Sequence, residues 1–106
     1  MKQMKFIDAG GYTADRPWEA LDLGEFDNAT VRLHWTDQPY TWHVNDGPEL
    51  FVVLDGAVDM HYRVNGEKRV ELLTPGTVCC VETGDEHVAH PAGTARILVI
   101  ERKGSI

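Results

Sequence analysis

Residues Trp42–Gly56 read WHVNDGPELFVVLDG, and they are the most informative stretch of the chain. Three polar residues, His43, Asn45 and Glu49, come just before the apolar run Leu50–Leu54. In an extended backbone His43 and Asn45 face the same side, because strand side chains alternate with a period of two. Glu49 follows a turn, shares its parity with Phe51 and Val53, and is expected to open the inward face of the next strand. Nitrogen and oxygen donors on rigid strands are typical of a metal site, for which a further donor must come from elsewhere.

The sequence on both sides of this stretch predicts further short strands. Residues Thr30–Thr36 and Val58–Val64 alternate apolar and polar side chains, which indicates strands. Turn signals such as Asn65-Gly66, which suits a type I′ turn, separate the runs about every 8–12 residues. The other strands are expected over Thr41–Val44, Glu49–Leu54, Glu67–Leu73, Thr77–Val81, His87–His90 and Ala95–Ile100. No sustained helical period occurs, so the pattern favours an all-β fold, a small antiparallel barrel or sandwich.

The chain length of 106 residues is enough for a single domain with one core. Residues 1–24 have no clear periodicity, and we expect an N-terminal arm there, within which Glu19–Leu23 is either a strand or a single helical turn, and a barrel over about residues 25–101. The strand Leu50–Leu54 is apolar throughout, so its outer face needs a cover as well as its inner one. A second copy of the chain is a natural cover for a protein with so small a core, and we expect a homodimer.

The composition disfavours several classes of function. The chain has 10 Lys and Arg against 17 Asp and Glu, a formal net charge of −7, which argues against nucleic acid and against an anionic membrane surface. No apolar run approaches the roughly 20 residues of a membrane span, and no apolar signal core follows Met1, so we expect a cytoplasmic protein. The only serine is Ser105, which excludes a serine nucleophile. The adjacent Cys79 and Cys80 are expected to be reduced thiols.

Two sequence motifs resemble those of the cupins. The first cupin motif, His-x-His-(x3–4)-Glu-(x6)-Gly, is matched by His43-x-Asn45-x3-Glu49-x6-Gly56. The second, Gly-(x5)-Pro-x-Gly-(x2)-His, is matched by Gly76-(x5)-Glu82-x-Gly84-x2-His87. The resemblance extends from about Pro17 to Glu101 and is to the small single-domain bacterial cupins. It implies a jelly roll, the cupin double-stranded β-helix.

The resemblance also implies a metal site whose ligands are His43, Glu49 and His87. Two imidazoles and one carboxylate suit iron, manganese, nickel or zinc and leave open positions. Asn45 stands where the family has its second histidine, and an amide oxygen is a weaker donor for transition metals. Asn45 is therefore either a weak fourth ligand or a cap of the turn that follows it. The alternative for the whole set is a metal-free pocket in which the histidines and Glu49 hydrogen-bond to one another.

The remaining histidines have different expected positions. His34 has the parity opposite to Leu33, so it is either a solvent-facing residue or a cavity-lining acid or base. His61 lies among polar residues and is expected to be exposed. His90 is three residues after His87, a spacing that points it to the other side of a strand.

These features lead to two hypotheses about function. The first is a metal-binding cupin barrel that acts on or binds a small molecule, with oxygenase-like or isomerase-like chemistry. The alternative is a non-catalytic barrel without metal that senses or stores a small molecule. The sequence does not identify the substrate, because a shift of one residue in strand register exchanges the inward and outward side chains.

Overall fold

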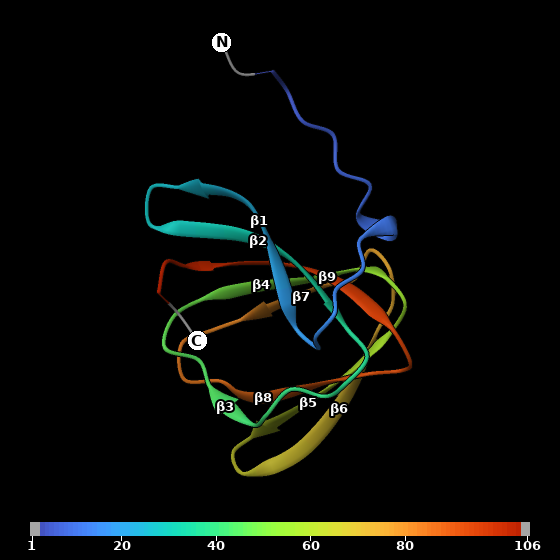
Figure 1. Cartoon of the computed structure of the whole chain (residues 1–106). Coiled ribbons are helices and arrows are strands. Elements are labelled where there is room, and N and C mark those ends of the chain that lie inside the picture. Colours follow the sequence, from blue (N-terminus) through green and yellow to red (C-terminus); the bar gives the residue numbers. More distant parts are fainter. Residues whose placement is uncertain (1–2, 105–106) are drawn as a thin grey trace.

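The computed structural model describes residues 3–104, and its nine strands form two antiparallel sheets (Figure 1). The strand order is β1-β2-β9-β4-β7 in the larger sheet and β3-β8-β5-β6 in the smaller. The strands are β1 Glu19–Phe26, β2 Ala29–Thr36, β3 His43–Val44, β4 Glu49–Asp55, β5 Val58–Val64, β6 Glu67–Leu73, β7 Val78–Val81, β8 Glu86–Pro91 and β9 Ala95–Arg102. A single 3₁₀ turn, η1 (Ala9–Gly11), precedes them. The predicted all-β fold is confirmed.

Strand β1 begins inside the stretch that was expected to be an arm. It pairs with β2, but the register shifts between Asp22 and Gly24. Such a bulge breaks the alternation of side chains, so the sequence pattern does not identify this strand. Strand β3 is also shorter than expected, since it covers only His43–Val44 rather than Thr41–Val44.

The core lies between the two sheets. Phe51 and Val53 of β4 point inward, as their parity with Glu49 predicted, and they are 5% and 0% exposed. They pack with Val58 and Met60 of the opposite sheet in one buried cluster. Three members of the cluster, Phe51, Ala89 and Val99, also line a hollow beside Glu49.

Two of the predicted turns depend on left-handed backbone. Asn65 and Gly66 have φ values of 51° and 79°, which confirms the type I′ turn expected there. Gly56 has a φ of 79°, and a Cβ atom at this position would clash with the backbone oxygen of Thr94. Gly56 is therefore required both by its own conformation and by the close approach of β9.

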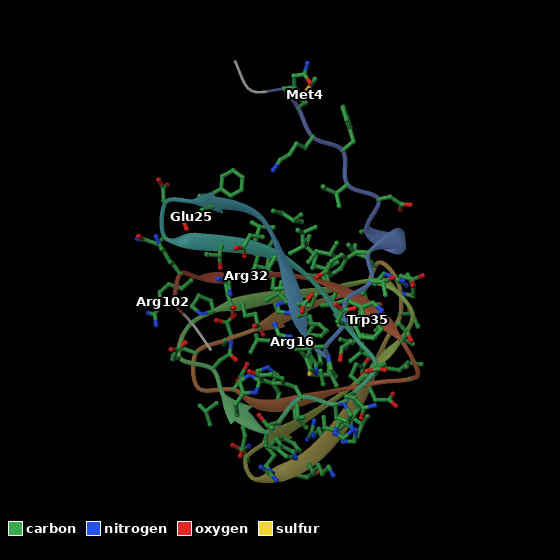
Figure 2. The ribbon with its side chains drawn as sticks, in the orientation of Figure 1. Met4, Arg16, Glu25, Arg32, Trp35 and Arg102 are labelled. Atoms are coloured by element: carbon green, nitrogen blue, oxygen red, sulfur yellow. The ribbon has the colours of Figure 1, made fainter. Side chains whose placement is uncertain are left out.

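The N-terminal segment leaves the barrel as an extended chain (Figure 1). Met4 and Phe6 are 84% and 88% exposed, and Figure 2 shows Met4 clear of the barrel. Further along, Arg96 holds the segment by donating to the backbone oxygen of Tyr12, and it also forms an ion pair of 2.6 Å with Asp55. No helix between residues 3 and 104 is long and apolar enough to span a membrane.

Candidate functional site

Strand pairing brings the two motif histidines together. His43 and His87 are direct partners in the antiparallel pair β3–β8, so both side chains lie on the same, inward face. Their ring centroids are 4.3 Å apart at an interplanar angle of 56°. His87 is only 4% exposed, whereas His43 is half-buried.

Glu49 approaches the same point from the other sheet. Its Oε1 atom lies 3.7 Å from Nε2 of His87, and the two side chains are 9% and 5% exposed. The separation is too long for a hydrogen bond but short enough for a charge contact. Burial alone raises the pKa of Glu49, but the neighbouring His87 and Glu101 side chains outweigh it and hold that pKa below its ordinary value. Glu49 is therefore an ionised carboxylate beside two imidazoles.

The tautomer of His43 follows from its backbone contact. Nδ1 of His43 lies 2.9 Å from the carbonyl oxygen of Thr41, and a carbonyl only accepts. Nδ1 therefore carries the hydrogen, and Nε2 keeps a lone pair. This is the tautomer in which a histidine ligates a metal through Nε2.

His34 lines the hollow that His43, Glu49 and His87 also line. A cavity-lining position was the second of the two positions expected for it. Its Nδ1 donates to the carbonyl oxygen of Trp18 at 2.8 Å, so its Nε2 also keeps a lone pair. Burial lowers the pKa of His34, and the hydrogen bond to Trp18 opposes this only in part. His34 is thus a neutral imidazole near neutral pH, able to accept a proton.

Glu101 is a site residue that the sequence analysis missed. It is the direct cross-strand partner of Glu49 on β9 and lines the hollow. Burial, and then the adjacent Glu49 carboxylate, raise the pKa of Glu101 to about 7. The sequence does contain a signal for this position. Ile97, Val99 and Glu101 share one parity along the strand, so if the two apolar side chains face the core, the carboxyl group of Glu101 also points into the barrel.

Asn45 does not reach the hollow. It is 3% exposed, and its Nδ2 donates to the carbonyl oxygen of Gly47 at 3.0 Å, within the turn after β3. Its Oδ1 is buried without a hydrogen-bond partner among residues 3–104. The expected shared face of His43 and Asn45 is therefore absent, because strand β3 ends at Val44.

The hollow itself is a concave pocket of about 240 Å³. Its walls include Trp18, Tyr40 and Phe51, and Tyr40 is 45% exposed. Arg32 and Glu101 add polar groups that the sequence analysis did not assign to a site. Within the described part of the chain, no three His, Cys, Asp or Glu side chains already have the arrangement of a metal centre.

The other histidines lie outside this hollow. The rings of His61 on β5 and His90 on β8 have their centroids 4.2 Å apart and are tilted by 43°. His90 points away from His87, as its spacing predicted. His61 is half-buried rather than exposed. Cys79 and Cys80 are free thiols.

Solved structures share this architecture, although no family model and no curated protein matches the sequence. A cupin-2 domain protein from Shewanella frigidimarina is 21% identical, over 85% of each chain, with a TM-score of 0.76. A cupin superfamily protein from Desulfitobacterium hafniense is 16% identical, over 97% of this chain and 94% of its own, with a TM-score of 0.75.

A third similar structure is an enzyme. It is a hydroquinone 1,2-dioxygenase in complex with Cd²⁺ and 4-hydroxybenzonitrile, 17% identical over 85% of this chain and 67% of its own, with a TM-score of 0.71. At these identities the similarity establishes the fold and not the activity. The chain therefore has the cupin jelly roll that its sequence motifs implied.

Proposed function

We propose that this cupin barrel binds a divalent transition metal through His43, Glu49 and His87, and that it binds or transforms a small molecule in the adjoining hollow. The observation that supports the proposal most is the convergence of these side chains from three strands of two sheets. Metal-dependent chemistry is plausible for this fold, since one structure that shares it is a dioxygenase that holds Cd²⁺.

The three side chains fit a metal chemically. Two imidazoles with one ionised carboxylate suit iron, manganese, nickel or zinc. Two donors on one ion, each about 2.1 Å from it, lie about 3.0 Å apart at an octahedral angle and about 3.4 Å apart at a tetrahedral one, so the 3.7 Å between Glu49 and His87 closes with a small side-chain movement. A bound ion would supply Lewis-acid polarisation of a carbonyl or hydroxyl oxygen.

The chain's own residues supply the rest of the chemistry. Trp18, Tyr40 and Phe51 give the hollow apolar walls that orient a small molecule and exclude water. His34 accepts a proton at Nε2, because its Nδ1 is committed to Trp18. Glu101 holds a proton near neutral pH beside the Glu49 carboxylate. A base and an acid in one hollow suit oxygenase-like or isomerase-like chemistry.

Metal analysis of matched variants tests the proposal. Purified protein is stripped with chelator, loaded with each candidate metal, gel-filtered and measured by inductively coupled plasma mass spectrometry. The wild type should retain a stoichiometric ion, His43→Ala and His87→Ala should lose it, and His61→Ala should keep it. A wild type that retains no metal, or His43→Ala and His61→Ala variants that retain equal amounts, would refute the proposal.

A non-catalytic barrel that senses or stores a small molecule is the second candidate. The position of Asn45 favours it, since this side chain caps a turn and offers the site no fourth donor. A stabilising ligand would then raise the melting temperature without turnover. Ligand affinity unchanged in His43→Ala would support this candidate over the first.

We also propose that the outer face of the larger sheet binds a second copy of the chain. Leu50 and Leu54 of β4 and Val78 of β7 are 38%, 38% and 50% exposed. Leu50 belongs to the apolar strand for which the sequence predicted a cover. Light scattering should give a dimeric mass for the wild type and a monomeric mass for Leu50→Glu, whereas a monomeric wild type would contradict the proposal.

A further inference from the structure

Arg32 is the only Arg or Lys among residues 3–104 that lines the hollow of the proposed metal ligands. The strand register places it there. Arg32 on β2 is the direct partner of Val99 on β9, and Val99 is the direct partner of Phe51 on β4. Direct partners share a face, so the three side chains form one row across the inner face of the larger sheet. All three line the hollow.

The base and the carboxyl group of the hollow lie next to this row. His34 follows Arg32 by two residues on β2, and Glu101 follows Val99 by two residues on β9, so both share the inward face. Burial is the main cause of the lowered pKa of His34, and the charge of Arg32 lowers that pKa further. The guanidinium group therefore acts on the space that His34 lines.

The guanidinium group of Arg32 is only weakly engaged by the protein. Its Nε lies 2.9 Å from Oδ1 of Asp22, but this nitrogen forms no hydrogen bond within residues 3–104. The Asp22 side chain is 80% exposed, so water and salt screen the ion pair. The Arg32 side chain is itself 41% exposed, which leaves its charge accessible to a ligand.

The charges that line the hollow favour an anion with a single charge. With a divalent ion bound, the ion and Arg32 carry three positive charges together, against at most two negative charges from Glu49 and Glu101. A ligand with one negative charge neutralises this excess, whereas a dianion would exceed it. This charge balance rests on the metal site proposed above.

The walls and the volume of the hollow limit the rest of the ligand. Trp18, Tyr40 and Phe51 present aromatic rings, which suit an apolar and preferably planar body. The volume of about 240 Å³ is below the range of about 300–1,000 Å³ for pockets that hold drug-sized ligands. The hollow therefore suits a body of about one ring.

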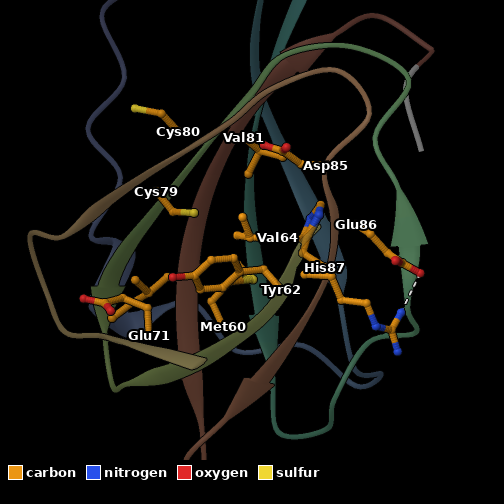
Figure 3. A pocket seen from close by; sticks show the side chains of 12 residues that line it. Met60, Tyr62, Val64, Glu71, Cys79, Cys80, Val81, Asp85, Glu86 and His87 are labelled. Carbon is orange, nitrogen blue, oxygen red and sulfur yellow. Dashed lines mark ion pairs between the residues drawn. The ribbon is translucent and has the colours of Figure 1, made fainter. Parts of the chain in front are cut away.

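A second hollow, between the edge strands β6 and β7, lacks an available cation (Figure 3). Its Arg63 is engaged by Glu86 in an ion pair of 2.6 Å, drawn as a dashed line in Figure 3. Glu71 and Asp85 line this second hollow as well and carry negative charge. An anion is therefore expected at Arg32 and not between β6 and β7.

We propose that the hollow of the metal site takes a small monocarboxylic acid with a body of about one ring, whose carboxylate pairs with the guanidinium group of Arg32. The planar guanidinium matches a carboxylate with two parallel hydrogen bonds, which a neutral amide cannot reproduce. The ring lies against Trp18, Tyr40 and Phe51, beside the metal ligands. Arg32 thus determines specificity, because it selects the acid over its neutral analogue.

Two probes and two arginine variants test this assignment in zinc-loaded protein by ¹⁹F NMR. The probes are 4-fluorobenzoate and its neutral analogue 4-fluorobenzamide. Arg32→Gln removes the cation from the hollow, and Arg69→Gln removes the same charge from a half-exposed position on β6 outside it. We expect saturable binding of the benzoate that Arg32→Gln weakens about tenfold or more and that Arg69→Gln leaves within about twofold. The benzamide should bind the wild type and Arg32→Gln equally weakly.

The zinc content of the same samples separates this inference from the proposed metal site. Arg32→Gln should retain zinc, because Arg32 is not one of the proposed ligands. A wild type that retains zinc but does not bind the benzoate would overturn the inference alone. Equal weakening by the two arginine variants would also overturn it, as would equal weakening of both probes by Arg32→Gln. A wild type that retains no zinc, or any other of the candidate metals, would overturn the metal site and this inference together.

Discussion

His43 and His87 face each other across the β3–β8 ladder with their ring centroids 4.3 Å apart. The pairing relies on a strand of only two residues, so the backbone next to it must be held from outside. Asn45 does this: its N–H donates to the carbonyl oxygen of Asp85 at 3.0 Å, and its carbonyl oxygen accepts from Gly84 at 2.9 Å. Asn45, which stands at the position of the motif's second histidine, thus supports the His43–His87 pair through its backbone.

The side chain of Asn45 also holds the turn, and its removal should cost stability. Asn45→Ala loses the hydrogen bond to Gly47, so we expect the free energy of unfolding to fall by about 1 kcal/mol. The melting temperature should drop by about 4–8 °C, as measured by circular dichroism. Asn45→Asp, which keeps the shape but cannot donate, should be at least as damaging. Wild-type stability in both variants would contradict this role.

Gly56 and Gly66 form a matched pair for a backbone test. Both have a φ of 79°, but a Cβ atom would strike the Thr94 carbonyl at Gly56 and would meet nothing within 4 Å at Gly66. Gly66→Ala should cost about 1 kcal/mol from the left-handed backbone alone. Gly56→Ala should cost more than about 3 kcal/mol, because β9 must also move. Equal effects in urea denaturation would contradict the close packing at Gly56.

The carboxyl pair should give the protein a measurable pH dependence. The pKa of Glu101 is raised to about 7 in the folded state, so the folded protein binds more protons than the unfolded chain between about pH 4.5 and 7. Stability from Glu101 is therefore present at low pH and is lost as the pH rises through about 7. Glu101→Gln keeps a neutral donor beside Glu49 and should escape this loss.

The measurement for Glu101 is the difference in unfolding free energy between variant and wild type, without metal. His34 and His61 have lowered pKa values and favour the folded state as the pH rises, so the wild-type profile alone mixes opposite effects. The histidine contributions cancel in the difference, which therefore reports the Glu49–Glu101 pair: Glu101→Gln should gain on the order of 1 kcal/mol from about pH 5 to about pH 8, after solvent screening. A constant difference would contradict the raised pKa.

The two adjacent cysteines should differ in reactivity. Burial raises the pKa of Cys79 from 9.0 to about 11, which reduces its thiolate fraction near pH 8 about 100-fold relative to an ordinary thiol. Cys80 is exposed. In iodoacetamide labelling followed by mass spectrometry, Cys80→Ser should react far more slowly than Cys79→Ser. Similar rates would show that the Cys79 thiol is not buried as described.

The fold was predictable because its signals are local. The turn at Asn65-Gly66 and the inward parity of Phe51 and Val53 needed no knowledge of distant strands. The side of β2 that lines the hollow was harder to assign, because both of its faces are covered: Leu33 is 0% exposed, yet His34 lines the hollow. Hydrophobic alternation identifies the core face only when the other face meets water.

The site residues that the sequence analysis missed reach the hollow through the arrangement of the strands, which the local sequence pattern does not specify. Glu101 meets Glu49 only because β9 lies beside β4 in this register, and sequence periodicity does not specify that pairing. Trp18 precedes β1 with a φ of 64°, outside any strand pattern. His43, Glu49 and His87 were predicted together because their motifs fix both spacing and parity.

Anomalous scattering from a metal-loaded crystal tests the central proposal most directly. Data collected on both sides of the absorption edge of the bound metal should show a single strong peak within about 2.0–2.3 Å of Nε2 of His43, Nε2 of His87 and a carboxylate oxygen of Glu49. The peak should vanish in His87→Ala. No peak at these three side chains in a metal-saturated crystal, or a peak that persists without His87, would contradict the account.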